Sequence, residues 1–312
     1  MTYDPLQNVL VALDGSDRSH EVIKYMTSAH LFKQNQTHIC LFCVHDSLSG
    51  HIEDLGNDTQ LQKSFPQFQK SINSARHLEL QSKRDSENFL EKCREELIAS
   101  GINEANITLK LQPKNIGIAR DIIAESKNGY GAVMIGRKGK GVMKSVNLGS
   151  IAMKLLSGIK EVPLALIGRD IPDSGKLLIA MDRSANSMKA LQFAASTFAG
   201  DNHDIELIHV IREALSTPPE VSEKFIGVVV PWMTEAKTQL IEKGFDDEQV
   251  SIKIATRQKS RARAIINEAE NGSIGTIITG RRGLSKVEEF FMGRVSNKIV
   301  QMGRFNAVWI VT

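Results

Sequence analysis

The sequence predicts an α/β protein built from two doubly wound parallel-sheet domains. Short apolar runs such as VLVAL (9–13), AVMIG (132–136) and PLALIG (163–168) alternate with helical stretches. Strands of this kind suit a parallel sheet that is covered by helices on both faces. The whole alternation also occurs twice along the chain. A chain of 312 residues is long enough for two domains, each with its own core.

The first half shows five strands separated by helices, beginning with the strand that ends at Leu13. The stretch SENFLEKCREELIASG (86–101) predicts a helix that stops at its glycine, because its apolar residues repeat at helical spacing. These residues are Phe89, Leu90, Cys93, Leu97 and Ile98. The remaining elements are a strand ICLFCV (39–44), a strand ITLKLQPK (107–114), a helix over 118–129, the strand AVMIG, a helix SIAMKLLSG (150–158) and the strand PLALIG.

The second half repeats these segments. NVLVALDGSDRSHEVIKYM resembles KLLIAMDRSANSMKALQFA, so Asp14 corresponds to Asp182, and AVMIGRKGKG resembles TIITGRRGLS. The first copy carries an insertion at about 47–84. We therefore expect one domain over 1–170 and a second over 175–312, joined where Pro and Gly interrupt the pattern near 168–176.

Composition narrows the class of protein. The net charge of +3 is too slight for a nucleic-acid-binding surface, and no apolar run is long enough to cross a membrane. Three cysteines argue against a disulfide framework, so we expect a cytoplasmic protein. Cys40 and Cys43 form a CxxC within a strand, where they face opposite sides and suit buried thiols rather than a metal site. His45 and His209 fit ordinary strand-end positions.

The segment IGRKGKGVMKSVNLGS (135–150) combines four glycines with four basic residues and ends on Gly-Ser. Glycines allow a ligand to approach the main chain, and a serine that opens a helix offers a hydroxyl and free N–H groups, which together suit a phosphate. The Walker loop does not fit, because Val142 and Met143 follow Gly141. The dinucleotide fingerprint fails because Lys144 stands at its third glycine. A solvated basic loop is the alternative reading.

The spacing of these glycines resembles the nucleotide signature of the ATP-binding branch of the universal stress protein family. The signature is Gly136, two residues, Gly139, nine residues and Gly149-Ser150. Asp14 after the first strand and Val44 closing the second also match. The resemblance covers nearly the whole chain, as a tandem two-domain member. It implies five-stranded sheets in order 3-2-1-4-5 and an intramolecular pseudo-dimer paired through the last strands, with further homodimerisation left open.

The resemblance also implies a role for each residue of the site. Asp14 would accept hydrogen bonds from the nucleoside, although a turn residue is the other reading, and Val44 would contact the base or simply fill the core. Gly136 and Gly139 would form an anion nest of main-chain N–H groups, and Gly149 would open a helix toward the phosphates. The expected set in the first half is Ala12, Asp14, Val44, Gly136, Arg137, Gly139, Gly149, Ser150 and Ile151.

The second half predicts a weaker site. Arg294 stands where the first copy has Ser150, and Arg183 replaces Gly15. Arg294 could bind a phosphate bidentately and strengthen this site, or its bulk could fill the space that the phosphates need. Two bulky side chains favour obstruction, so we expect tight nucleotide binding in the first half only. The corresponding set is Asp182, Val210, Gly280, Gly283, Gly293 and Arg294.

We therefore expect an ATP-binding stress-response protein that acts as a nucleotide-dependent regulatory module, with Mg²⁺ on the phosphates and an unidentified protein partner. Efficient hydrolysis would need a positioned water, a base and a metal clamp, and the glycine-rich loop supplies no obvious carboxylate. A nucleotide-independent dimeric scaffold and an ATP-using transferase are the alternatives. The insertion contains the apolar residues Leu61, Phe65 and Phe68, which could cap the first domain or form a small docking surface. A lid over the nucleotide is a further alternative, and a plain surface excursion is the favoured reading.

Overall fold

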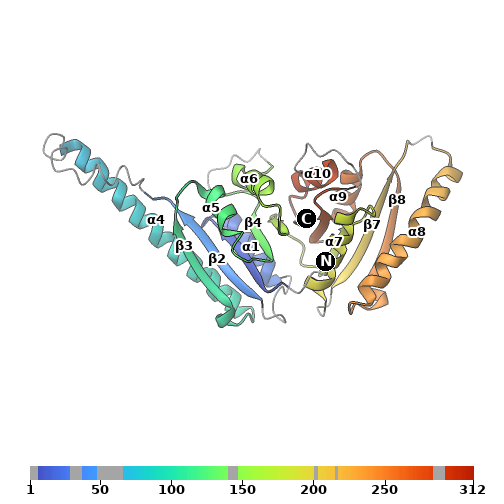
Figure 1. Ribbon diagram of the computed structural model, residues 1–312, viewed down its shortest axis with the longest axis horizontal. Helices are drawn as coiled ribbons and strands as arrows, with labels where there is room; N and C mark the ends of the chain where they lie inside the picture. Colours follow the sequence, from blue (N-terminus) through green and yellow to red (C-terminus); the bar gives the residue numbers. More distant parts are fainter. Residues whose placement is uncertain are drawn as a thin grey trace.

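The computed structural model describes residues 6–28, 37–47, 66–139, 147–199, 203–214, 217–283 and 292–312, with the main chain alone for 66–69. Strands and helices alternate along both halves, as the sequence predicts (Figure 1). The first half contains β1 (Asn8–Leu13), α1 (Asp17–Ser28), β2 (His38–His45), α4 (Pro66–Ala99), η1 (Glu104–Asn106), β3 (Ile107–Pro113), α5 (Ile118–Glu125), β4 (Ala132–Gly136), α6 (Ser150–Gly158) and β5 (Leu164–Ile167). The second half contains β6 (Lys176–Ala180), α7 (Ala185–Phe198), β7 (Asp204–Arg212), α8 (Pro219–Ile241), η2 (Asp247–Gln249), β8 (Val250–Gln258), α9 (Arg261–Asn271), β9 (Thr276–Gly280), α10 (Arg294–Met302) and β10 (Ala307–Val311).

The strands form one ten-stranded sheet in the order β3-β2-β1-β4-β5-β10-β9-β6-β7-β8. Each half keeps the expected order 3-2-1-4-5, but the expectation of two separate five-stranded sheets is wrong. The halves join because β5 and β10 pair antiparallel, with Ala165 opposite Trp309 and Leu166 opposite Val308. Both strands are fully buried, and an unpaired edge would leave their main-chain polar groups without partners. The expected pairing through the last strands is confirmed.

Helices cover both faces of this sheet. The helices α1, α4, α7 and α8 pack on one face, and α5, α6, α9 and α10 pack on the other (Figure 1). Each face has one hydrophobic core that draws residues from both halves: Met26 of α1, Ile167 of β5 and Trp309 of β10 belong to the same buried cluster. The division into domains at 1–170 and 175–312 stays a prediction, because sheet and core continue across that boundary.

The helix α4 shows where part of the insertion goes. It has 34 residues, against 23 in its counterpart α8, and it extends beyond the sheet in Figure 1. The predicted apolar stripe is confirmed, since Leu90, Cys93 and Leu97 are buried in the core. The beginning of the helix, by contrast, leaves Leu78 and Leu80 exposed. Leu61, Phe65 and the side chain of Phe68 lie outside the described residues.

The two cysteines of the CxxC are buried on opposite faces of the sheet, as predicted. Cys40 lies in the core under α5 and α6, whereas Cys43 lies in the core under α1 and α4. Burial raises the pKa of the Cys40 thiol, which keeps it protonated. Within the described part of the chain, no three His, Cys, Asp or Glu side chains are grouped to hold a metal ion. No described helix has the length and apolar character to span a membrane.

Candidate functional site

The two predicted aspartates follow β1 and β6 and form the same turn. Asp14 Oδ1 accepts hydrogen bonds from the Ser16 N–H (3.1 Å) and hydroxyl (2.6 Å). Asp182 Oδ1 accepts from the Ser184 N–H at 3.0 Å. Asp14 therefore has the turn role that its DGSD context allows. Both loops bring a carboxylate to the carboxyl ends of neighbouring parallel strands, where doubly wound folds bind ligands.

Gly139 and Gly283 lie directly against these carboxylates. A Cβ added to Gly139 would lie 2.2 Å from Asp14 Oδ2, and one added to Gly283 would lie 2.2 Å from Asp182 Oδ2. The structure thus brings Gly139 close to Asp14 and Gly283 close to Asp182. Any side chain at either glycine would displace the carboxylate.

The glycines that end β4 and β9 leave room for the starts of α1 and α7. A Cβ on Gly136 would lie 2.8 Å from the Arg18 carbonyl oxygen, and one on Gly280 would lie 2.6 Å from the Asn186 carbonyl carbon. The absence of a side chain at these glycines therefore allows the helices α1 and α7 to pack closely on the sheet. Neither these glycines nor Gly139 and Gly283 are among the described residues with positive φ, so the missing side chain at each position allows close approach rather than a left-handed main chain.

Gly149 and Gly293 precede α6 and α10 and fold alike. Their N–H groups donate to the carbonyls of Arg137 and Arg281, at 2.9 Å in both halves. Each is an extended N-cap without a side-chain cap, so the first-turn N–H groups of the helix are left for another acceptor. In the first half Ser150 is exposed at this helix start, while residues 140–146 of the loop lie outside the described residues.

Ala12 and Val44 are buried in the core under α5 and α6, and Ile151 packs against that core. The burial of Val44 agrees with its alternative role as a core residue. Among the described residues, no contact of Val44 indicates whether it also binds a base.

A cavity of about 570 Å³ lies in the second half, at the carboxyl ends of β6, β7 and β9 and the starts of α9 and α10. One part of its wall is apolar: Met181, Ile208, Val210, Ala262 and Ile265. Six cationic residues also line the cavity: Arg212, Lys259, Arg261, Arg282, Arg294 and Lys298. Among the described lining residues, Asp182 is the one carboxylate. Such a wall suits a ligand with one apolar end and one anionic end.

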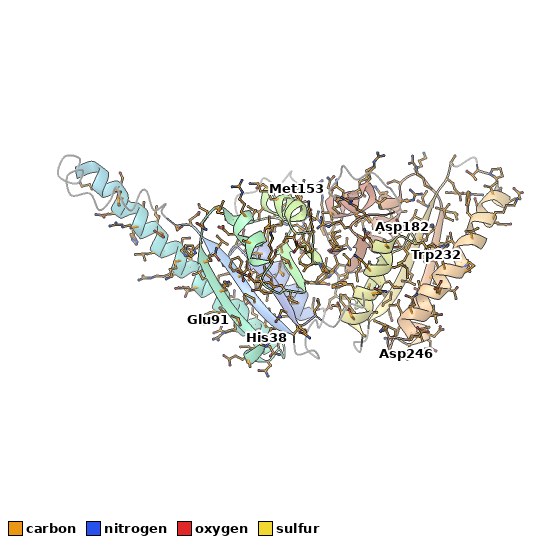
Figure 2. All side chains as sticks on the ribbon, in the orientation of Figure 1. His38, Glu91, Met153, Asp182, Trp232 and Asp246 are labelled. Atoms are coloured by element: carbon orange, nitrogen blue, oxygen red, sulfur yellow. The ribbon has the colours of Figure 1, made fainter. Side chains whose placement is uncertain are left out.

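His209 lines this cavity, a feature that the sequence reasoning missed. It lies within β7 rather than at its end, and its Nδ1–H donates to the Met181 carbonyl at 2.7 Å. Its ring packs edge-on against Trp232, with 5.1 Å between the ring centroids, and Figure 2 labels Trp232 and Asp182. Burial lowers the pKa of His209, which favours the neutral imidazole. The adjacent Val210 carbonyl accepts a hydrogen bond from Arg261 Nε at 3.2 Å.

Neither of the two arginines that were expected to obstruct the second half fills its cavity. Arg183 is exposed and does not line the cavity, because it adopts φ 61°, close to the φ of 72° at Gly15 in the first half. The turn thus keeps its left-handed shape and directs this side chain to solvent. Arg294 lines the cavity instead of filling it.

Arg137 lies in a place that the sequence did not predict. It is 5% exposed, and its Nη2 donates across the seam between the halves to the Gln301 carbonyl of α10 at 3.3 Å. Arg281 mirrors it, with Nη1 donating to the Leu156 carbonyl of α6 at 2.8 Å and Nη2 to the Ile159 carbonyl. Each arginine therefore binds the last carbonyls of the other half's helix. Burial lowers the pKa of both guanidinium groups to about 10.

The comparisons with known proteins fit this geometry. Residues 174–306 match the model of the universal stress protein family. This segment is a universal stress protein domain. The universal stress protein YxiE of Bacillus subtilis (strain 168) is 29% identical over 141 residues, which cover 41% of this chain and 92% of that protein. The family resemblance is thus confirmed for the second half, and for the first half it stays a prediction.

Solved structures extend the likeness in fold. The crystal structure of a universal stress protein from Archaeoglobus fulgidus DSM 4304 matches 98% of this chain and 98% of its own, with 18% identity and a TM-score of 0.63. This match shows that the whole chain shares that fold. A universal stress protein from Archaeoglobus fulgidus in complex with dAMP matches 44% of this chain and 97% of its own, with 15% identity and a TM-score of 0.34.

Proposed function

We propose that this protein is an adenine-nucleotide-binding stress-response protein that holds ATP in the cavity of its universal stress protein domain. The observation that carries the proposal is the cavity of about 570 Å³ beside Asp182, with one apolar wall and one cationic wall. Its volume falls in the range of small-molecule sites, and its place at the switch between β6 and β9 is where doubly wound sheets bind nucleotides.

The lining residues suit each part of a nucleotide: the base, the ribose and the phosphates. The base would pack on Val210 and Met181, and the ribose hydroxyls would donate to Asp182. The phosphates would lie at the start of α10, where Gly283 and Gly293 leave no side chain in the way. Among the lining cations, Arg294 and Lys298 stand on the first turns of that helix and would neutralise phosphate charge.

We further propose the second half as the principal site. Tighter binding in the first half was expected from obstruction by Arg183 and Arg294, and neither side chain blocks the cavity. Arg294 instead offers a fork of donors that Ser150 lacks. The matching closeness of Gly139 to Asp14 supports an equivalent site in the first half.

The proposed role is a nucleotide-dependent switch with slow turnover or none. Mg²⁺ would bind to the phosphates of the nucleotide and neutralise part of their charge. Among the described lining residues, Asp182 is the candidate base, and it is already engaged: Oδ1 accepts from Ser184 and Oδ2 lies against Gly283. A protein partner would then recognise the loaded or empty state.

Mass spectrometry of the small molecules released on denaturation tests the ligand directly, and calorimetry with ATP and Mg²⁺ gives affinity and stoichiometry. We expect an adenine nucleotide in the released fraction and a large loss of affinity in Lys298→Gln. Lys243→Gln is the matched control, because this exposed lysine follows α8 and does not line the cavity. Wild-type protein that neither releases nor binds a nucleotide would reject the proposal in favour of a scaffold. Steady formation of a transferred product from ATP would instead support a transferase.

A further inference from the structure

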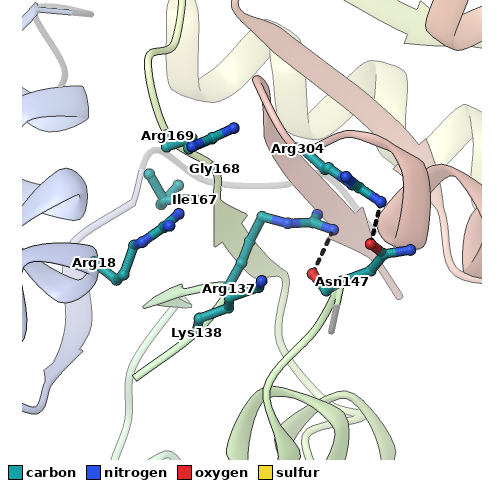
Figure 3. Close-up of a pocket in the computed structure, with 8 residues that line it drawn as sticks. All are labelled: Arg18, Arg137, Lys138, Asn147, Ile167, Gly168, Arg169 and Arg304. Atoms are coloured by element: carbon teal, nitrogen blue, oxygen red, sulfur yellow. Dashed lines mark hydrogen bonds between the residues drawn. The ribbon is translucent and has the colours of Figure 1, made fainter. Parts of the chain in front are cut away.

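A second cavity, of about 300 Å³, lies in the seam between the two halves. Its wall carries five cationic side chains: Arg18 from the start of α1, Arg137 and Lys138 after β4, Arg169 after β5, and Arg304 after α10. Asn147, Ile167 and Gly168 complete the described lining, which contains no carboxylate. Figure 3 shows these side chains around the space, with Asn147 bound to Arg137 and Arg304.

Arg137 supplies a buried donor that needs an acceptor. Its side chain is 5% exposed, and Nη2 binds the Gln301 carbonyl at 3.3 Å and approaches that of Asn147 at 3.5 Å. Nη1 of the same guanidinium is buried and has no hydrogen-bond partner among the described residues. A buried donor without an acceptor is costly, and it costs more when it carries charge. A ligand oxygen in the cavity would satisfy it.

The charges around the cavity also favour the binding of an anion. The pKa of Lys138 is lowered, first by burial and then by Arg18, Arg304, Arg137 and Arg169, in that order. The carboxylate of Asp170 lies 3.8 Å from Arg169 Nε, but the side chains are 77% and 48% exposed, so water screens the pair. Five like charges therefore converge on one small space, and a multivalent anion would relieve their repulsion.

We propose that the seam cavity binds a small multivalent phosphate anion of the pyrophosphate class. Phosphate oxygens would accept from Arg137 Nη1, while Arg18, Lys138 and Arg304 neutralise the charge. The cavity has about half the volume of the nucleotide cavity, which suits a phosphate group better than a whole nucleotide. The two cavities share no lining residue. Because Arg304 belongs to the second half, the anion would also bind the halves together.

The test is calorimetry with pyrophosphate at low salt on the full chain. We expect one pyrophosphate per chain at the seam. Arg18→Asn places there the residue that the second half carries at the matching position, Asn186, so this variant keeps a side chain that the fold already accommodates. We expect it to lower pyrophosphate affinity about tenfold, and Arg18→Asn with Arg304→Gln to lower it further. Lys243→Gln, which removes one charge outside both cavities, should leave the affinity unchanged.

Arg294→Ser separates this proposal from the nucleotide site. If it abolishes pyrophosphate binding while Arg18→Asn does not, the anion binds in the nucleotide cavity and the seam proposal is overturned. Wild-type protein that binds no pyrophosphate overturns it as well. Pyrophosphate binding that depends on Arg18 supports the seam site even in protein that binds no ATP. Titrating ATP into the Arg294→Ser variant identifies the source: competition with pyrophosphate shows that a nucleotide's phosphate chain can occupy the seam, and no competition shows that the site takes a free anion.

Discussion

Gly283 has no room for a side chain, since an added Cβ would lie 2.2 Å from Asp182 Oδ2. We therefore expect Gly283→Ala to push the carboxylate out of the cavity wall and to weaken ATP binding by tenfold or more, measured by calorimetry. Gly227→Ala is the control, because Gly227 is exposed within α8 and a Cβ there would meet nothing within 4 Å. That control should bind ATP normally and gain about 0.5–1 kcal/mol of stability. Unchanged ATP affinity in folded Gly283→Ala would remove Asp182 from the proposed site.

At the residue scale, the sequence located the important positions better than it explained them. The repeat and the glycine spacing identified Asp182, Gly283 and Gly293, which line one cavity. The spacing could not tell a glycine that needs positive φ from one that needs close approach, since both demand a missing side chain. It also could not show that Arg183 turns to solvent, because that depends on the main-chain conformation of a single residue.

At the element scale, Arg281 binds the end of α6 and Arg137 the end of α10, each from the opposite half. We expect Arg281→Met to lower the free energy of unfolding by about 2–4 kcal/mol, because the carbonyls of Leu156 and Ile159 lose a charged, buried donor. Urea denaturation followed by circular dichroism measures the loss.

Arg263→Met provides the comparison for that substitution. Arg263 is exposed on α9, so the same change of side chain should alter stability by about 0.5 kcal/mol or less. Equal losses in the two variants would contradict a capping role for Arg281.

The helix α4 marks the limit of sequence reasoning about elements. Periodicity predicted the buried stripe at Leu90, Cys93 and Leu97, because those positions face the sheet. It could not predict that the helix starts at Pro66, within the polar insertion. A polar helix that extends beyond the core leaves no apolar pattern to read.

At the scale of the whole molecule, a hydrogen-bonded group joins the halves inside the core. Trp309 Nε1 donates to the Tyr25 hydroxyl at 3.2 Å, and that hydroxyl meets Thr276 Oγ1 at 2.9 Å. Burial raises the pKa of Tyr25 from 10.0 to about 12. The unfolded chain therefore loses this proton from about pH 10 upward while the folded protein keeps it to about pH 12, so stability falls as the pH rises through this interval.

Tyr25→Phe should flatten that alkaline decline by up to about 1.4 kcal/mol per pH unit. Below pH 10 the variant should be less stable by about 1–3 kcal/mol, because the Trp309 N–H then lies buried without an acceptor. Urea denaturation at several pH values between 8 and 12 measures both effects. Parallel pH profiles for wild type and variant would contradict the buried state of Tyr25.

The sheet shows what a repeated sequence can and cannot predict about assembly. Two copies of an apolar strand pattern predicted two parallel sheets, each with an apolar edge strand that needs covering. The strand order 3-2-1-4-5 and the pairing through the last strands came from the family resemblance. That β5 and β10 cover one another within one continuous sheet depends on how the copies meet in space. Local patterns carry no information about that contact beyond the apolar character of both strands.

One continuous sheet predicts one cooperative unfolding transition. Met26, Ile167 and Trp309 share a buried cluster across the seam, so neither half can unfold without exposing the core of the other. The two tryptophans, Trp232 and Trp309, both lie in the second half, and their fluorescence reports on that half, whereas far-ultraviolet circular dichroism reports on the helices of both. We expect the two signals to give the same urea midpoint. Dichroism that shows two steps, with fluorescence following one of them, would mean that the halves fold independently and that the pairing of β5 with β10 adds little to stability.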